Sequence, residues 1–281
     1  MSDGVAKGTL YVVSTPIGNL GDLSARAIAV LGAVDVVLAE DTRHTRPLLT
    51  HLGLRTPLEA VHAHNEGDAA LRLVARLVGG ASAALVSDAG TPLVSDPGGV
   101  LVAAAIEAGV PVVPVPGPSA VLAALTGSGL PAVPFTFFGF LARKGAERRA
   151  RLADLADLPH TAVLYEAPPR VGETLADLVE AGLGARRLVV ARELTKKFEE
   201  FRRGTVEDLA AYYAETPPKG EVVLVLEGAP PAPPADDTTV AAPGSALRAA
   251  GRDARTIQRE LMERLGLSRN AAYRAARLEA P

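Results

Sequence analysis

The chain has 281 residues, of which 48% are hydrophobic and 22% charged, and its formal net charge at pH 7 is −3, as expected for a globular protein with a full core. The absence of cysteine excludes disulfide bonds, thiolate metal sites and a thiol nucleophile, and it favours a cytoplasmic location. No apolar run approaches the roughly 20 residues of a membrane span, so we expect neither a membrane segment nor a targeting signal.

Short apolar segments alternate with helical ones in residues 1–126, which we take as a first domain. Strands are predicted at residues 9–14, 34–39, 58–64, 82–86 and between 109 and 116, and helices at 24–31, 68–78 and 100–108. Because strands that alternate with helices are joined by right-handed crossovers, this pattern predicts an α/β domain with a parallel sheet.

A segment dense in glycine and proline, residues 127–134, is the predicted joint to a second domain that ends at residue 228. Strands are predicted at residues 135–140, 161–166, 188–192, 199–204 and 221–227, and helices at 146–155, 171–179 and 206–213. The last of these segments are joined by short loops, so we expect the second sheet to mix parallel and antiparallel pairs.

Residues 229–245 are rich in proline and alanine and are predicted to form an extended linker. The remaining residues, 246–281, are predicted to form two short helices, at 253–265 and 268–278. This tail contains eight arginines and four acidic residues, a net charge of +4, which leaves −7 for the rest of the chain. A nucleic-acid partner would therefore be held by local basic patches.

Two interpretations of the tail remain open. The helices could dock on the body of the protein through apolar side chains, namely Leu261, Leu265, Tyr273 and Leu278. Alternatively, the arginines spread around both helices suit a phosphate surface, which would make the tail an auxiliary clamp for RNA or for a ribosomal subunit.

Two loops at neighbouring strand ends carry the most unusual chemistry. The first, residues 87–98, contains Asp88 and Asp96 among several glycines and prolines, and the second is Pro-Gly-Pro-Ser at residues 116–119. Such loops let the backbone approach a ligand closely, and the carboxyl ends of parallel strands are where open α/β sheets bind ligands. The chain lacks the glycine-rich fingerprints of dinucleotide and nucleoside triphosphate sites, so a different cofactor is favoured.

At these loops a family resemblance appears. VSDAGTPLVSDPG (residues 86–98) and PGPSA (116–120) resemble the signature of the tetrapyrrole methylase superfamily of S-adenosylmethionine enzymes. Further motifs resemble its ribosomal RNA small subunit methyltransferase I branch, namely TPIGNLGDLS, AEDTRHT, YEAPPR, RELTK and PPKGEVVLV. The resemblance covers residues 8–228. It implies a two-domain class III methyltransferase fold, a cofactor cleft between the domains and a homodimer.

The resemblance also implies an activity and a cofactor site. The expected reaction is S-adenosylmethionine-dependent 2′-O-methylation of a cytidine in 16S ribosomal RNA, either free or within the assembled small subunit. Cofactor contacts are implied at Pro16, Asp88, Gly90, Thr91, Val94, Ser119, Ala120, Tyr165, Leu194 and Gly220. The chain departs from the expected pattern at Ala142, Ala167 and Pro169, which leaves any catalytic role of the loop at 167–169 in doubt.

Two other functions are kept as alternatives. A corrin or porphyrinogen methylase of the same fold would suit an apolar cleft, but it leaves the basic run at residues 143–151 unexplained. A non-catalytic RNA-binding module for ribosome assembly would explain that run, but retention of both cofactor loops argues against it. The run could also be an ordinary solvated helix face.

Candidate residues for chemistry and for RNA binding stand mostly at strand ends. Carboxylates that could act as general base are Asp41, Glu66, Glu166 and Glu193, and the sequence does not rank them. Cations that could contact RNA phosphates are Arg43, Arg46, Arg143, Lys144, Arg148, Arg149, Arg170, Arg192 and Lys196. We expect no metal, because His62 and His64 have no further residues to complete a ligand set.

Overall fold

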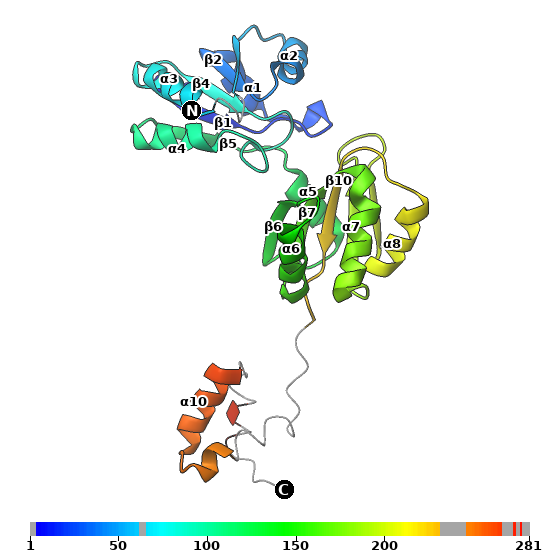
Figure 1. The fold of residues 1–281 in the computed structure, drawn as a ribbon. Coiled ribbons are helices and arrows are strands. Elements are labelled where there is room, and N and C mark those ends of the chain that lie inside the picture. Colours follow the sequence, from blue (N-terminus) through cyan, green and yellow to red (C-terminus); the bar gives the residue numbers. More distant parts are fainter. Residues whose placement is uncertain (1–3, 62–65, 231–245, 266–271, 274–275, 277–281) are drawn as a thin grey trace. The chain divides into compact units, whose positions relative to one another are not determined.

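The computed structural model describes the chain except for residues 1–3, 62–65, 231–245, 266–271, 274–275 and 277–281. It divides into two compact units, Met1–Ala229 and Pro230–Pro281. The first unit contains two lobes, each built on a five-stranded sheet (Figure 1). Within the described residues, no helix has the length and apolar character needed to cross a membrane.

The sheet of the first lobe is entirely parallel, as predicted. Its strands are β1 (Leu10–Val13), β2 (Val36–Ala39), β3 (Leu58–Ala60), β4 (Ala83–Val86) and β5 (Val112–Val115). Their order across the sheet is β3-β2-β4-β1-β5, and every neighbouring pair runs in the same direction. The third strand ends at Ala60, and the rest of its predicted range, including His62 and His64, lies outside the described residues.

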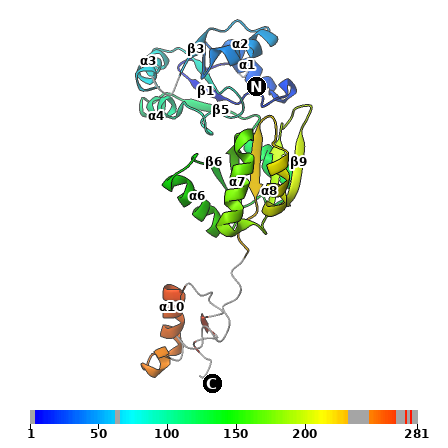
Figure 2. The ribbon, with the colours of Figure 1, turned by 45° about the vertical axis from the view of Figure 1, so that its right-hand side comes forward.

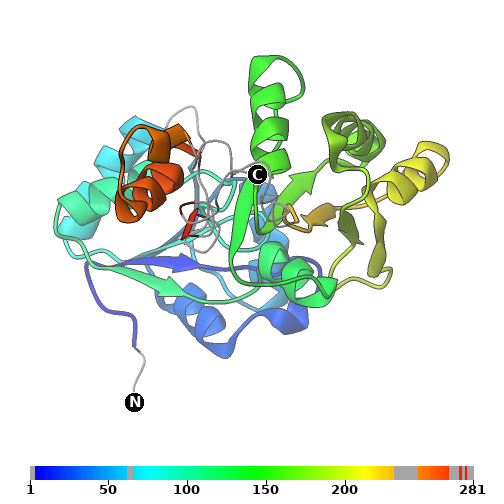
Figure 3. The same cartoon turned by 90° about the horizontal axis from the view of Figure 1, so that it is seen from below.

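Helices cover both faces of this sheet, as Figure 3 shows for α1 and α4. The helices are α1 (Ala25–Ala33), α2 (Thr42–His51), α3 (Glu66–Val78) and α4 (Gly99–Glu107), with a short 3₁₀ turn at Leu20–Asp22. In β2, Val37 and Ala39 pack with α1 and α2, whereas Val36 and Leu38 pack with α3 and α4. Burial on both faces explains why these strands are continuous apolar runs.

The sheet of the second lobe is mixed, also as predicted. Its strands are β6 (Phe135–Phe140), β7 (Thr161–Glu166), β8 (Arg187–Arg192), β9 (Glu200–Thr205) and β10 (Val222–Leu226). In the order β6-β7-β10-β8-β9, only the first pair is parallel. One face is covered by α6 (Ala146–Asp157), α7 (Val171–Leu178) and α8 (Val206–Glu215), which Figure 2 shows side by side. Short helical turns at Pro168–Arg170 and Val179–Leu183 flank α7.

The other face of the second sheet is covered by α5 (Ala120–Ser128). Its buried residues Val121 and Leu125 pack against the strands, and Ile17, from the loop after β1, joins the same hydrophobic cluster. The predicted joint, residues 127–134, overlaps only the last two residues of this helix, which packs on the second lobe. The two lobes share one buried contact region around Ile17.

The second unit has a small core of its own. It contains α10 (Ala254–Leu265), in which Ile257 and Leu261 are buried against Ala272 and Ala276. Tyr273, one of the predicted docking residues, is 45% exposed. Leu278 and the side chain of Leu265 lie outside the described residues.

Candidate functional site

Three loops meet at the carboxyl ends of β1, β4 and β5. Thr15 and Gly90 exchange two backbone hydrogen bonds, of 2.8 and 3.1 Å. The Thr91 hydroxyl lies 3.0 Å from the Ser14 hydroxyl and donates to the Pro118 carbonyl at 3.0 Å. Gly90 has φ +83°, and a Cβ added there would lie 3.3 Å from Ile17. The loops therefore form one interlocked wall with little room to move.

This wall bounds a cavity of about 370 Å³, within the range of small-molecule sites. The first lobe contributes Ile17, Ala89, Gly90, Ser95 and Asp96, and α5 contributes Ala120. The second sheet and its loops contribute Phe140, Tyr165, Glu166, Ala167, Pro168, Glu221, Val222 and Val223. Three residues of the expected cofactor set, Gly90, Ala120 and Tyr165, are among them.

The other expected cofactor residues surround the cavity without lining it. Pro16 and Asp88 line a neighbouring hollow of about 260 Å³ together with His44, whose Nδ1 lies 2.7 Å from the Asp88 carboxylate. Two others hold the loops, since Thr91 bonds to the neighbouring loops and Ser119 caps α5. Val94 and Leu194 pack in the core that the lobes share. Gly220 lies against the Glu193 side chain.

Backbone strain is concentrated in two loops of the first unit. Leu93 and Ser95 have φ of 72° and 73° in the loop after β4, and Glu193 and Thr195 have φ of 51° and 66° in the loop after β8. Non-glycine residues adopt this left-handed conformation only when their surroundings enforce it, and such residues cluster at functional sites. Ser95 itself lines the cavity.

Asp96, which the sequence analysis placed in the loop at residues 87–98 but not among the candidate bases, lines the cavity. Burial is the largest of several effects that raise its pKa to about 6, and the nearby charges of Glu40 and Asp88 act in the same direction. The pKa of Tyr165, across the same cavity, is raised to about 12, again mainly by burial. The sequence signal was the second aspartate of the loop at residues 87–98, but its burial depends on residues distant in the chain.

Three of the four candidate bases are already held by hydrogen bonds or ion pairs, and the side chain of the fourth, Glu66, lies outside the described residues. Asp41 caps α2 and accepts hydrogen bonds from the Arg43 backbone and guanidinium, which lower its pKa. The Lys196 ammonium donates to Glu193 at 2.9 Å and is the main cause of the lowered pKa of that carboxyl. Glu66 begins α3, but its side chain lies outside the described residues.

Glu166 reaches the cavity wall but is already engaged. Its carboxylate accepts hydrogen bonds from the Thr174 hydroxyl at 2.6 Å and from the Ala167 backbone at 2.8 Å. It also pairs with the Arg170 guanidinium at 3.5 Å. A carboxylate with these partners fixes the loop after β7, and its oxygens are already engaged.

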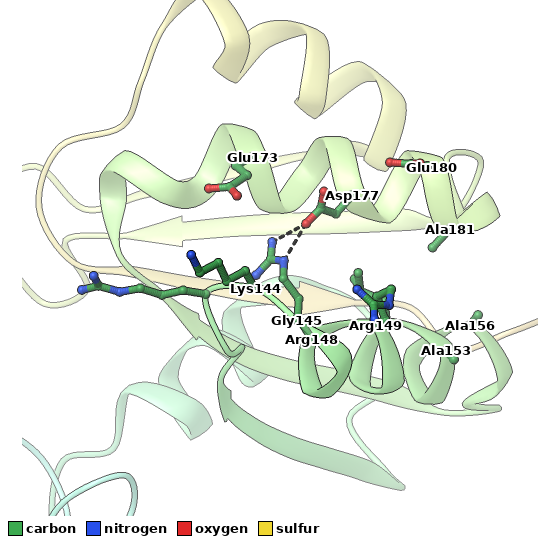
Figure 4. A pocket seen from close by; sticks show the side chains of 12 residues that line it. Lys144, Gly145, Arg148, Arg149, Ala153, Ala156, Glu173, Asp177, Glu180 and Ala181 are labelled. Atoms are coloured by element: carbon green, nitrogen blue, oxygen red, sulfur yellow. Dashed lines mark hydrogen bonds and ion pairs between the residues drawn. The ribbon is translucent and has the colours of Figure 1, made fainter.

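The structure corrects the expectation that Arg148 contacts RNA. This side chain is 6% exposed and its guanidinium pairs with Asp177 of α7 at 2.6 Å (Figure 4). It also donates to the Thr174 hydroxyl and to the Ala142 carbonyl. Because all these donors are used inside the lobe, Arg148 links α6 to α7 and is unavailable to a phosphate.

The remaining predicted cations fall into two groups. Arg43, Arg170, Arg192 and Lys196 form ion pairs with Asp41, Glu166, Glu200 and Glu193 respectively. Arg46, Arg143, Lys144 and Arg149 are exposed. Arg143, Lys144 and Arg149 border a groove of about 610 Å³ between α6 and α7, whose opposite wall carries Glu173 and Glu180 (Figure 4).

The cavity residues fit S-adenosylmethionine. Small residues such as Ala89, Gly90 and Ala120 leave space for the ligand beside the backbone, and Ile17 and Val223 offer apolar surface to an adenosine. The Glu221 carboxyl also lines the cavity and adds negative charge beside a ligand that carries ammonium and sulfonium charges.

The fold and the site define a class of enzyme. The family model of Tetrapyrrole (Corrin/Porphyrin) Methylases matches residues 9–210, so the chain belongs to that family. Uroporphyrin-III-C-methyltransferase from Thermus thermophilus is 26% identical, with a TM-score of 0.57 over 78% of this chain and 94% of the other. Diphthine synthase, at 16% identity, shares the fold with a TM-score of 0.61 over 78% and 90% of the two chains.

Within this class the chain belongs to the ribosomal RNA small subunit methyltransferase I family, which confirms the resemblance seen in the sequence. The relative of that name from Xylella fastidiosa is 55% identical over 224 residues, 79% of this chain and 82% of the relative. The relative from Synechocystis sp. is 46% identical over 95% and 96% of the two chains. The one from Micromonospora olivasterospora is 47% identical over 99% and 89%.

Proposed function

We propose that this chain transfers the methyl group of S-adenosylmethionine to the 2′-hydroxyl of a cytidine in 16S ribosomal RNA. The observation that carries the proposal is the cavity between the lobes, where the interlocked loops of the first lobe face Tyr165 and Glu221 of the second. The name of the relatives, which are up to 55% identical to this chain, supports ribosomal RNA of the small subunit as the acceptor. The choice of a cytidine and of its 2′-hydroxyl as the methylated group rests on the family resemblance of the sequence motifs.

Positioning is the largest contribution that the chain can make to this reaction. S-adenosylmethionine, when bound, supplies a methyl group activated by the sulfonium charge. Aligning two reactants supplies roughly 7–11 kcal/mol, whereas a general base supplies typically 10²–10⁴-fold, about 3–5 kcal/mol. The rigid loops around Gly90 and the clamped carboxylate of Glu166 therefore matter more than any single proton acceptor.

RNA would be held by exposed cations and by one exposed ring. Arg46 lies on α2, Arg143 and Lys144 lie in the loop before α6, and Arg149 lies in the first turn of α6. Phe140, which is 57% exposed, lines the cavity with its ring centre 5.5 Å from that of Tyr165. Single-stranded bases stack on such aromatic side chains, so Phe140 is suited to hold an unstacked nucleotide beside the methyl donor.

Three finer features belong to the same proposal. The chain acts as a homodimer, in the cytoplasm, and accepts the RNA within the assembled small subunit. Support comes from the family resemblance and the absence of cysteine, and sedimentation of the purified protein tests the dimer.

The test is transfer of radioactive methyl from S-adenosylmethionine to isolated 16S ribosomal RNA, small subunits and whole ribosomes, followed by mapping of the label. We expect label on a single cytidine ribose, with the small subunit as the best acceptor. A porphyrinogen serves as the control acceptor. Label on the porphyrinogen and none on RNA would identify a tetrapyrrole methylase, and failure to bind S-adenosylmethionine in calorimetry would favour the non-catalytic module.

A further inference from the structure

We propose, resting on the methyl transfer above, that the carboxylate of Asp96 accepts the proton of the RNA hydroxyl as the methyl group is transferred. The residue lines the cavity and comes from the loop after β4, which also supplies Gly90 to the wall. Among the carboxylates of the described residues that line this cavity, Glu166 is held by Thr174 and Arg170, and Glu221 pairs with Lys196 at 3.1 Å.

The backbone holds Asp96 in place. Ser95, directly before it, adopts φ of 73°, and Pro97 follows directly. The Ser87 hydroxyl, which donates to the Ala89 and Gly90 carbonyls at the end of β4, lies close enough to Asp96 to lower its pKa against the effect of burial. A left-handed residue on one side and a proline on the other restrict the backbone of this segment, which keeps Asp96 at the cavity wall.

The surroundings of Asp96 favour its protonated form more than those of an ordinary surface aspartate. From the first lobe it faces Glu40 and Asp88, and Asp88 is paired with His44. From the second lobe Tyr165 is near enough for the Asp96 charge to contribute to its raised pKa, and Glu166 and Glu221 line the same cavity. A carboxyl with a pKa of about 6 is still mostly ionised at pH 7 and accepts a proton more readily than Asp41 or Glu193, whose pKa values are lowered.

The two reactants are the ribose hydroxyl of the RNA and the methyl donor, S-adenosylmethionine. The hydroxyl oxygen of the ribose forms a bond to the methyl carbon, and the carbon–sulfur bond breaks with its electron pair remaining on sulfur. The hydroxyl proton passes to the Asp96 carboxylate and is later released to water. The products are a methyl ether on the RNA and a neutral thioether.

The experiment compares the full-length protein with Asp96→Asn and Asp96→Glu. Asp154→Asn is the matched control, since Asp154 lies on the exposed side of α6, where it pairs with Arg151. Asp96→Asn should lower kcat by about 10²–10⁴-fold, while calorimetric affinity for S-adenosylmethionine changes by less than about threefold. Wild-type kcat should fall about tenfold per pH unit below pH 6, and the pH profile of Asp96→Asn should lack this fall. Asp96→Glu should restore part of the activity, with the fall centred at a different pH.

A second readout does not depend on activity. Because the pKa of Asp96 in the folded protein, about 6, is above the usual aspartate value of 3.8, ionising Asp96 costs folded-state stability. This cost is absent below pH 4 and fully present above pH 6. The melting temperature of Asp96→Asn should therefore rise relative to that of the wild type as the pH rises from 4 to 8. The melting temperature of Asp154→Asn should keep a constant difference from that of the wild type over the same range.

Two results would overturn the role of Asp96 while leaving the proposed function intact. One is an active wild type whose Asp96→Asn variant keeps kcat within about threefold. The other is a variant whose whole loss is explained by weaker S-adenosylmethionine binding, which would make Asp96 a cofactor ligand. A wild type that binds the cofactor but labels no ribosomal RNA would instead overturn the proposed function, and this step with it.

Discussion

Arg148 and Arg149 are neighbours on α6 with the same charge and opposite surroundings. Arg148 is buried against Asp177 and Thr174, whereas Arg149 is exposed at the groove between α6 and α7. From the sequence both belong to one basic run, because spacing alone does not reveal that α7 places an acidic residue against one of them. The pair therefore offers a matched test of structural and RNA-binding roles.

Arg148→Ala should destabilise the protein by about 3–5 kcal/mol, because it removes the buried donor that the Asp177 carboxylate and the Ala142 carbonyl share inside the lobe. Arg149→Ala should leave stability within about 0.5 kcal/mol of the wild type. It should weaken RNA binding and flatten the slope of log K against log salt by about 0.7–0.9. Urea unfolding and salt-dependent RNA titrations measure the two effects, and an unchanged slope for Arg149→Ala would make this part of the run an ordinary solvated surface.

The sequence predicted those site residues whose position depends on nearby residues in the chain, such as residues at strand ends. Gly90, Ala120 and Tyr165 stand at or beside strand ends in the sequence, and the structure places all three on the cavity wall. The state of a carboxylate depends instead on partners far away in the chain. Glu166 is engaged by Thr174, and Asp96 is half-buried in a cavity that both lobes line, so no spacing rule would have ranked Asp96 above Glu166.

At the scale of elements, the sequence predicted the alternation of strands and helices but missed α2 and α5. Pro47 lies inside α2, whose residues are otherwise mostly polar, and the helix begins at a cap made by Asp41. In α5 nearly every residue is small or apolar, so no amphipathic period appears. That composition is explained by its place between Ile17 and the second sheet.

The loop after β4 can be tested with two glycine substitutions. Gly90 (φ +83°) lies against Ile17, and Gly53 (φ +69°) follows α2 with no other atom within 4 Å of an added Cβ. Each change to alanine should cost about 1–2 kcal/mol through the left-handed backbone alone. Only Gly90→Ala should also displace the cavity wall and weaken S-adenosylmethionine binding, by about tenfold or 1.4 kcal/mol. Equal cofactor affinities in the two variants would remove Gly90 from the cofactor site.

At the scale of the whole molecule, the two compact units allow a clean truncation. Ala229 closes the first unit by donating its backbone N–H to the Leu158 carbonyl, so a chain that ends at Ala229 keeps that contact. The second unit buries Ile257 and Leu261 within itself, and removing it takes away a complete small core.

The truncated chain should keep its affinity for S-adenosylmethionine and its melting temperature. If the basic tail holds the substrate, KM for the RNA or subunit should rise, and the rise should shrink at high salt because the contacts are electrostatic. Steady-state kinetics at two salt concentrations provide the measurement. An unchanged KM at both concentrations would leave the tail without a role in substrate binding.

The position of α5 in the chain has a consequence for synthesis on the ribosome. This apolar helix ends at Ser128, but the last strand that buries it, β10, ends at Leu226, about 100 residues later. At roughly 5–20 residues per second, the helix waits about 5–20 s before its partner sheet is complete. During that interval we expect its apolar surface to be exposed on the nascent chain, where chaperones can bind it.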